Sequence, residues 1–298
     1  MIRPAVFGAN QETAATNEFQ KKITTDDDRL LALALREFDG VVAQLQAAGV
    51  QVVEIADSES PVTPDAIFPN NWLTTHRDGQ CVLYPMQPRS RRPERRPDII
   101  RQLASRYDFD VRRIVDWSDF ENHDLFLEGT GSVVLDRVHR NAYACLSTRT
   151  DHRVLEYFCE HFNYQAVEFA ATGPSGQAIY HTNVMMCVGT HFAIICAEAI
   201  ADPGQRDQVL DELATHHEIV TLSMVQMSQF GGNMLELRNH EDQTLLVMSR
   251  RACAALEAGQ RRVLERHAQI IACDVDTIED TSGGSVRCML AEIYLSRR

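Results

Sequence analysis

The chain has 298 residues, of which 44% are hydrophobic, and it carries a formal net charge of −13. This length and composition suffice for one large domain or two. The negative charge argues against nucleic acid or an anionic membrane as the main partner, because both require a basic face. There is no apolar run of about 18 residues that could cross a membrane, and residues 1–20 lack the apolar centre of a signal peptide. We therefore expect a soluble, cytoplasmic protein.

Helical and extended segments alternate along the chain. The first predicted helix, residues 26–48, starts with acidic residues and is followed by Gly49, as helix ends favour. Apolar periodicity and proline positions predict further helices over 98–107, 150–162, 203–216 and 249–267. Short β-branched runs predict strands over 50–55, 111–117, 131–136, 191–197, 218–224 and 243–249.

The chain also shows weak internal repetition. Five helices in this length suggest a repeated unit of about 60 residues. A glycine-rich turn precedes an apolar run at 127–136, 229–237 and 282–290, and a Thr-His pair followed by cysteine recurs at an offset of 115 residues (Thr75 and Thr190). Glycine before a strand permits close approach of another backbone. We therefore expect a ring of strand–strand–helix–strand units whose glycine-rich turns meet at one central face.

The cysteines and histidines give no framework for a disulfide or a metal. None of the eight cysteines forms a C-x-x-C pair, and most lie in apolar runs typical of buried fillers. The histidines match no common metal-ligand spacing, so we expect neither metal nor cofactor. Cys288 differs from the others because it ends the segment SGGSVRC, which we expect to form the last strand. It is either a buried filler or a nucleophile at the end of that strand.

Two further residues could assist such a nucleophile. A thiolate at neutral pH needs a base or a positive neighbour, and His181 in YHTN follows a glycine-rich loop. Glu128 in LEGTGS adjoins an apolar run, where a carboxylate must be paired or functional. A structural histidine and an exposed glutamate are the alternatives. Together the three could attack an electron-poor carbon, protonate a leaving nitrogen and orient the histidine.

Six short motifs occur in an order that resembles the guanidino-group-modifying, or pentein, superfamily: PDAIFPNNW (64–72), SRRPE (90–94), LEGTGS (127–132), LSTRT (146–150), HTN (181–183) and GGSVRC (283–288). The opening pattern RP..F..N.ET...N.FQ is similar to the amidinotransferase-like branch of citrulline hydrolases, which is related to dimethylarginine dimethylaminohydrolases and arginine deiminases. The resemblance implies a five-fold α/β propeller of ββαβ units around a central channel, formed by one catalytic domain over residues 1–298.

The resemblance also implies roles for individual residues. Cys288 matches the family nucleophile, His181 the acid/base and Glu128 the carboxylate of the triad. Asp65 resembles the acid that binds the substrate α-amino group.

Arg91 and Arg149 resemble arginines near the substrate carboxylate, for which a guanidinium fork is well suited. The arginine-rich segment 84–97 has the composition of an exposed loop, and the resemblance gives it this second interpretation.

Two positions depart from the deiminase pattern. Arginine deiminases carry aspartate where this chain has Asn71 and Asn183, and Asn70–Asn71 matches an acidic pair of dimethylarginine hydrolases. A buried guanidinium without a carboxylate partner is costly. An asparagine can instead donate to a ureido oxygen and accept from its NH2 group. We therefore predict hydrolysis of citrulline to ornithine, CO2 and ammonia, with all three asparagines binding substrate.

Other interpretations stay open on the sequence. The same chemistry could act on arginine, as a dihydrolase or deiminase, or on a methylarginine. A protein of another class, a non-catalytic pentein-fold binding protein, would need neither the cysteine nor the histidine. Residues 7–20 could form a lid or a plain surface loop, and the chain could form a homodimer.

Overall fold

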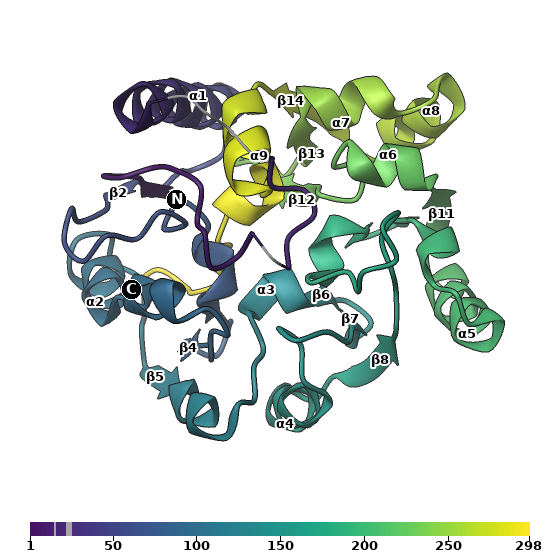
Figure 1. The fold of residues 1–298 in the computed structure, drawn as a ribbon, viewed down its shortest axis with the longest axis horizontal. Helices are drawn as coiled ribbons and strands as arrows, with labels where there is room; N and C mark the ends of the chain where they lie inside the picture. Colours follow the sequence, from purple (N-terminus) through teal and green to yellow (C-terminus); the bar gives the residue numbers. More distant parts are fainter. Residues whose placement is uncertain (15, 22–25) are drawn as a thin grey trace.

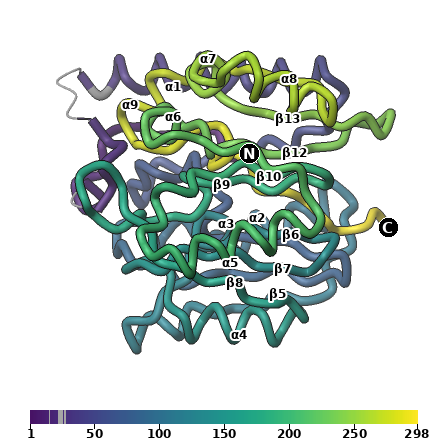
Figure 2. The backbone as a smooth tube through the Cα atoms, turned by 90° about the vertical axis from the view of Figure 1, so that its right-hand side faces the viewer, coloured from purple at the N-terminus to yellow at the C-terminus, as the bar shows by residue number. Residues whose placement is uncertain are grey.

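The computed structural model describes residues 1–14, 16–21 and 26–298, and Figure 1 shows its helices arranged around a common centre. Strands lie inside this ring, and Figure 2 shows α1, α7 and α8 on one side of the strands and α4 on the other. The α-helices of the described residues are α1 (Asp27–Ala47), α2 (Pro97–Ser105), α3 (Gly129–Ser132), α4 (His152–Phe162), α5 (Pro203–Ala214), α6 (Met224–Ser228), α7 (Arg250–Ala255), α8 (Ala258–His267) and α9 (Asp276–Ser282).

Four units of the described chain share one sheet topology. In each, the first strand is antiparallel to the second, and the second is parallel to the third. A parallel pair needs a long crossover, which α2, α4, α5 and α7–α8 provide. The sheets are β3 (Leu73–Thr75), β4 (Gln80–Leu83) and β5 (Arg113–Asp116); β6 (Val133–Asp136), β7 (Asn141–Cys145) and β8 (Gln165–Phe169); β9 (Met186–Val188), β10 (Phe192–Ile195) and β11 (Glu218–Thr221); β12 (Leu235–Arg238), β13 (Thr244–Ser249) and β14 (Gln269–Cys273).

The fifth unit combines both ends of the chain. Strand β1 (Ile2–Arg3) pairs in parallel with β2 (Ile55–Ala56), and α1 forms the crossover between them. The C-terminal segment joins this unit to its neighbour, because Thr75 Oγ1 donates to the Glu292 carbonyl and accepts from the Tyr294 amide. The predicted five-fold ring of ββαβ units is therefore confirmed.

Some local predictions were wrong. The predicted helix 249–267 is two helices, because Leu256 is extended between α7 and α8. Of the predicted strand 50–55 only its last residue is in a strand, and residues 286–289, expected in the last strand, form a 3₁₀ turn. The Thr-His-Cys repeat is not structural either, since Cys81 lies in β4 whereas Cys196 follows β10. Six strands that pattern analysis missed have only three to five residues each: β3, β4, β7, β8, β9 and β14.

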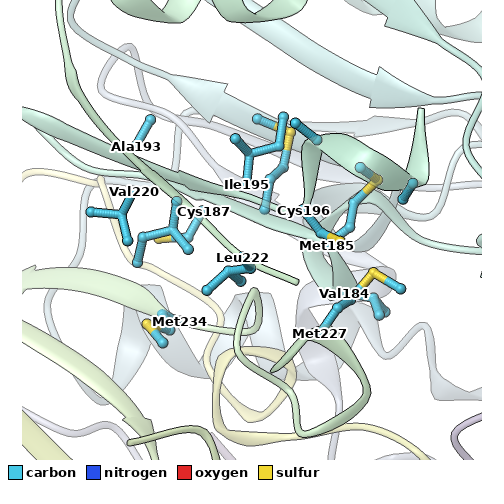
Figure 3. Close-up of a cluster of buried hydrophobic side chains, with 14 of the residues drawn as sticks. Val184, Met185, Cys187, Ala193, Ile195, Cys196, Val220, Leu222, Met227 and Met234 are labelled. Carbon is cyan, nitrogen blue, oxygen red and sulfur yellow. The ribbon is translucent and has the colours of Figure 1, made fainter. Parts of the chain in front are cut away.

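Apolar packing supports the turns that carry the polar residues of the centre. Figure 3 shows part of the cluster around the third sheet, in which Val184, Met185 and Met234 pack with strand residues. Val184 follows Asn183 and Met234 follows Asn233, so this packing anchors both asparagines. None of the described helices combines the length and the apolar character needed to span a membrane.

Candidate active site

Short turns directly before the first strand of four units, and the turn that precedes the C-terminal segment in the fifth, converge at one end of the ring. Helix α3 packs against two 3₁₀ segments, η1 (Pro69–Asn71) and η4 (Thr182–Val184). The segment η1 also packs against a third, η6 (Val286–Met289). A ring places equivalent turns of successive units next to one another, so residues far apart in sequence meet there. The turns are the 3₁₀ segments η1 (Pro69–Asn71), η4 (Thr182–Val184) and η6 (Val286–Met289), helix α3, and Gly231–Asn233.

The Cys288 turn is held from both sides. Helix α9 ends at Gly283, whose φ of 69° is a left-handed conformation that glycine adopts without strain. Gly284 packs so closely on Phe68 that an added Cβ would lie 2.6 Å from its ring. Ser285 Oγ donates to Glu279 Oε1 at 2.6 Å. Cys288 thus lies on a 3₁₀ turn after a glycine pair rather than at a strand end, and its side chain is buried.

Two asparagine amides surround the sulfur. The Nδ2 groups of Asn183 and Asn233 donate to Cys288 Sγ at 3.5 and 3.3 Å. Asn233 is oriented because its Oδ1 accepts from the Arg287 amide at 3.0 Å. Sequence reasoning missed Asn233, although it lies in the glycine-rich repeat 229–237. Its position two residues before β12 matches that of Asn71 before β3, which is the signal that could have identified it.

His181 and Glu128 form a buried pair. His181 Nε2 lies 2.8 Å from Glu128 Oε2, and the Gln87 amide donates to Glu128 Oε1 at 3.0 Å. Burial alone would raise the pKa of Glu128, but Arg149, the His181 hydrogen bond and Arg91 together lower it to about 2. Burial lowers the pKa of His181 to about 4 despite the neighbouring Glu128. A neutral imidazole beside a carboxylate is therefore the resting state at neutral pH.

The guanidinium of Arg91 is committed to protein partners. It donates to both oxygens of Glu94, at 2.9 and 2.8 Å, and to Asn71 Oδ1 at 2.8 Å. Asp65 lies 3.7 Å from its Nε. Arg91 therefore orients Asn71 in this structure, and its guanidinium is not free to bind a substrate carboxylate. Sequence analysis did not single out Glu94, although its spacing of three from Arg91 in SRRPE was visible.

The described residues of the N-terminal segment 7–20, which are 7–14 and 16–20, lie against the site. Asn10 Nδ2 donates to Asp65 Oδ2 at 2.7 Å, and Arg149 Nη2 donates to Thr16 Oγ1 at 2.7 Å. Asn17 Nδ2 bonds the Ser282 carbonyl at 3.0 Å. In Figure 1 this dark purple segment crosses the middle of the ring near α9 and α3. The segment predicted as lid or loop thus contacts Asp65 and Arg149, two residues predicted to bind substrate.

Most of the predicted site residues line one small cavity. Its lining includes Asp65, Asn71, Arg91, Arg149, His181 and Cys288, together with Thr13 and Asn17 of the N-terminal segment. Asn183 and Thr130 line a second cavity, together with residues of β6 and β9. Asn70 lies at the contact with α3, where its carbonyl accepts from Thr130 Oγ1 at 3.3 Å, and it is not among the residues lining either cavity.

Two amide atoms near the thiol have no hydrogen-bond partner within the described part of the chain. They are Asn71 Nδ2, a donor, and Asn183 Oδ1, an acceptor. The orientation of the Asn71 amide follows from Arg91, whose guanidinium can only donate and therefore faces the oxygen. The orientation of Asn183 follows from its Nδ2 donation to Cys288 Sγ. Buried polar groups normally have partners, so a ligand with one acceptor and one donor fits here.

Comparisons with solved structures support this fold. The substrate-bound N-terminal domain of ArgZ, a cyanobacterial arginine dihydrolase, superimposes with a TM-score of 0.72 at 14% identity, covering 100% of this chain and 96% of that one. AgrE in complex with ornithine and NAD+ gives a TM-score of 0.75 at 15% identity over 100% of this chain, which spans only 39% of AgrE. A dimethylarginine dimethylaminohydrolase with an S-methyl-L-thiocitrulline adduct gives 0.62 at 14% identity, with coverage of 97% and 96%.

Sequence comparison identifies the family. No curated protein matches the chain significantly. The family model for eukaryotic N,N dimethylarginine dimethylhydrolase, in contrast, matches residues 3–295, nearly the whole chain. The chain therefore belongs to the N,N dimethylarginine dimethylhydrolase family, within the pentein superfamily of hydrolases related to arginine metabolism.

Proposed function

We propose that this protein hydrolyses citrulline to ornithine, CO2 and ammonia. The observation that carries the proposal is the pair of unpartnered amide atoms, Asn71 Nδ2 and Asn183 Oδ1, beside Cys288. A ureido group offers both a carbonyl oxygen and NH2 hydrogens, and it complements one donor and one acceptor. A guanidinium has only donors, and one of them would face the Asn71 NH2 group.

The charges near the site support a neutral substrate head group. Glu128 is paired with His181, and Arg149 and Arg91 lie 3.8 and 3.9 Å from its Oε2 atom. Glu94 is bonded to Arg91 by both oxygens. No carboxylate of the described site is thus left without a cation or a histidine to bind a buried guanidinium, which would be costly without one.

In the proposed reaction, the neutral His181 takes the proton of the Cys288 thiol, and the resulting thiolate attacks the ureido carbon. The Nδ2 groups of Asn183 and Asn233 stabilise the sulfur. Asn71 donates to the oxyanion of the tetrahedral intermediate, a contribution worth roughly 3 kcal/mol in other enzymes. Ammonia leaves with a proton that His181 delivers, and an S-alkylthiocarbamate remains on the sulfur. Water, deprotonated by His181, then releases a carbamate that decays to ornithine and CO2, and the thiol is restored.

The amino-acid end of the substrate would bind to other residues that line the same cavity. We assign the α-amino group to Asp65 and the α-carboxylate to Arg149, whose Nε has no partner among the described residues. Arg91 acts through Asn71 and Glu94, and the placement of Asn70 beside Thr130 suggests support of α3. Segment 7–20 would have to move for entry, because it contacts both Asp65 and Arg149. We propose that residues 1–298 act as one cytoplasmic catalytic domain without a cofactor, and a homodimer stays a prediction.

The test is to incubate the full chain with citrulline, arginine or a methylarginine and to quantify ornithine, citrulline and ammonia. We expect one ornithine and one ammonia per citrulline, negligible turnover of arginine, and no activity for Cys288→Ser. A mass increase on Cys288 during turnover would identify the thiocarbamate. The paired variant Asn71→Asp, which replaces the free donor with an acceptor, should lose citrulline turnover.

Arginine is the second candidate, because the chain shares its fold with an arginine dihydrolase. If arginine were converted to ornithine with release of two ammonia molecules, the substrate would be arginine rather than citrulline. Accumulation of citrulline from arginine would mean that the two amides do not select a neutral group.

A further inference from the structure

A second cluster of chemistry-bearing side chains lies away from the candidate active site. Asp136 ends β6, His139 lies in the hairpin turn that follows, and His217 lies between α5 and β11. One ligand atom from each can be chosen so that all three lie within 4.8 Å of one another. Strand β6 begins next to α3 of the active site and ends at Asp136, so the cluster lies at the opposite end of that strand.

The Asp136 carboxylate is fixed by the hairpin. Its Oδ1 atom accepts from the Val138 and His139 amides at 3.0 and 2.9 Å. Its Oδ2 atom faces both imidazole rings, at 2.8 Å from His139 Nδ1 and 3.4 Å from His217 Nε2. The turn thus leaves one carboxylate oxygen directed at two nitrogens.

His217 is the residue that ordinary hydrogen bonding does not satisfy. Its side chain is 1% exposed, and its Nδ1 lies 3.2 Å from the Leu213 carbonyl. Its Nε2 faces the carboxylate and has no hydrogen-bond partner of acceptable geometry among the described residues. Both ring nitrogens therefore face oxygen acceptors, and a neutral imidazole has only one proton to offer.

With a proton on Nδ1 for the Leu213 carbonyl, the Nε2 lone pair of His217 faces the Asp136 oxygen, an arrangement that a cation between the two atoms would stabilise.

We propose that Asp136, His139 and His217 bind a divalent transition-metal ion of the Zn2+ type. Imidazole nitrogen and carboxylate oxygen suit zinc, and two ligand atoms at about 2.1 Å from a tetrahedral ion lie roughly 3.4 Å apart. The Asp136–His217 distance of 3.4 Å matches this edge. His139 is half-buried and would rotate slightly to widen its shorter distance to Asp136. The hydrogen bond from His217 Nδ1 to the Leu213 carbonyl is typical of metal-binding histidines.

The ligands come from two adjacent units of the ring. The hairpin belongs to the sheet of β6–β8, and His217 belongs to the unit of β9–β11. Metal binding would therefore link neighbouring units, and we assign it a stabilising role. Sequence spacing does not reveal it, because His217 is far from the hairpin along the chain.

The test uses the full chain with Cys288→Ser, which removes the active-site thiolate as a competing ligand. After dialysis against a chelator, zinc is titrated by calorimetry, and bound metal is counted by mass spectrometry. We expect one ion per chain with a Kd of micromolar or below, and a Tm increase of roughly 5 °C at 100-fold excess over Kd.

In the same background, His139→Ala and Asp136→Asn should each weaken zinc binding at least about 10-fold. Asp136→Asn retains an oxygen for the turn amides, so it tests ligation separately from folding. His240→Ala, which removes an exposed histidine, should bind zinc like its parent. The proposal would be overturned if the parent showed no saturable zinc binding. It would also be overturned if His139→Ala and Asp136→Asn bound zinc as tightly as the parent does.

Discussion

At the scale of residues, the site depends on which atom of each side chain is already occupied. Asn71 uses its oxygen for Arg91, and Asn183 uses its NH2 group for Cys288, so the free atoms are a donor and an acceptor. Asn233 has both ends engaged, by the Arg287 amide and by the sulfur. Three asparagines thus have three different electrostatic effects, which residue type alone does not distinguish.

Asn233→Ala removes a hydrogen bond to the sulfur. We expect kcat for citrulline to fall about 100-fold, the usual cost of losing one preorganised donor. The rate of Cys288 alkylation by iodoacetamide at a fixed neutral pH should fall as well. Asn122→Ala, which removes an exposed asparagine bonded to Asp119, is the matched control. An alkylation rate unchanged in Asn233→Ala would show that this amide does not act on the thiolate.

At the scale of elements, the turns before the first strands position the chemistry, and close packing limits their side chains. In α3, an added Cβ at Gly131 would lie 2.8 Å from His181 Nδ1 and would also contact Asn71 Nδ2. At Gly40, in the middle of α1, an added Cβ meets nothing within 4 Å. The two helical glycines therefore differ in function.

Gly131→Ala should reduce kcat/KM at least about 100-fold, because His181 and Asn71 must both shift and small displacements of reacting groups are costly. Gly40→Ala should leave kcat/KM unchanged and increase the free energy of unfolding by about 0.5–1 kcal/mol, since alanine is the better helix residue. Steady-state kinetics and urea unfolding of both variants check this pair. Equal activity of Gly131→Ala and the parent would contradict the packing of α3 against the site.

At the scale of the whole molecule, ring closure buries several titratable groups. Burial lowers the pKa of His76 to about 3 and that of His181 to about 4, both from 6.5. The pKa of Glu128 is lowered from 4.5 to about 2. At these three groups the unfolded chain binds protons at higher pH than the folded chain does, which favours unfolding in acid. Burial raises the pKa of Glu94 to about 8 and that of Glu279 to about 7, and these two groups act in the opposite direction.

The free energy of unfolding should therefore decrease as pH falls from 6.5 towards 3 through the histidines, and below 4.5 also through Glu128. Each group contributes on the order of a few kcal/mol. Urea unfolding at pH 7, 5.5 and 4.5 measures the slope. His76→Gln should flatten it, whereas His240→Gln, at an exposed position, should not. A slope in His76→Gln as steep as in the parent would mean that this buried ring does not carry the effect.

What the sequence determined by itself is the class of fold and most residues of the candidate site. The six motifs in order predict the ring, which the structure and the family match confirm, and they name residues that lie together around Cys288. Long helices were predictable from periodicity, whereas β3 and β9, with three residues each, carry too little pattern.

Only the tertiary structure decided the contacts of Asn233 with the sulfur and of Glu94 with Arg91. It also decided the 3₁₀ conformation of the Cys288 turn. It also brought His217 to the hairpin of Asp136. The physical reason is common to all of these features. Each depends on a hydrogen bond or an ion pair that forms only when separate parts of the ring meet. The local sequence does not indicate which of these partners a given atom will bind.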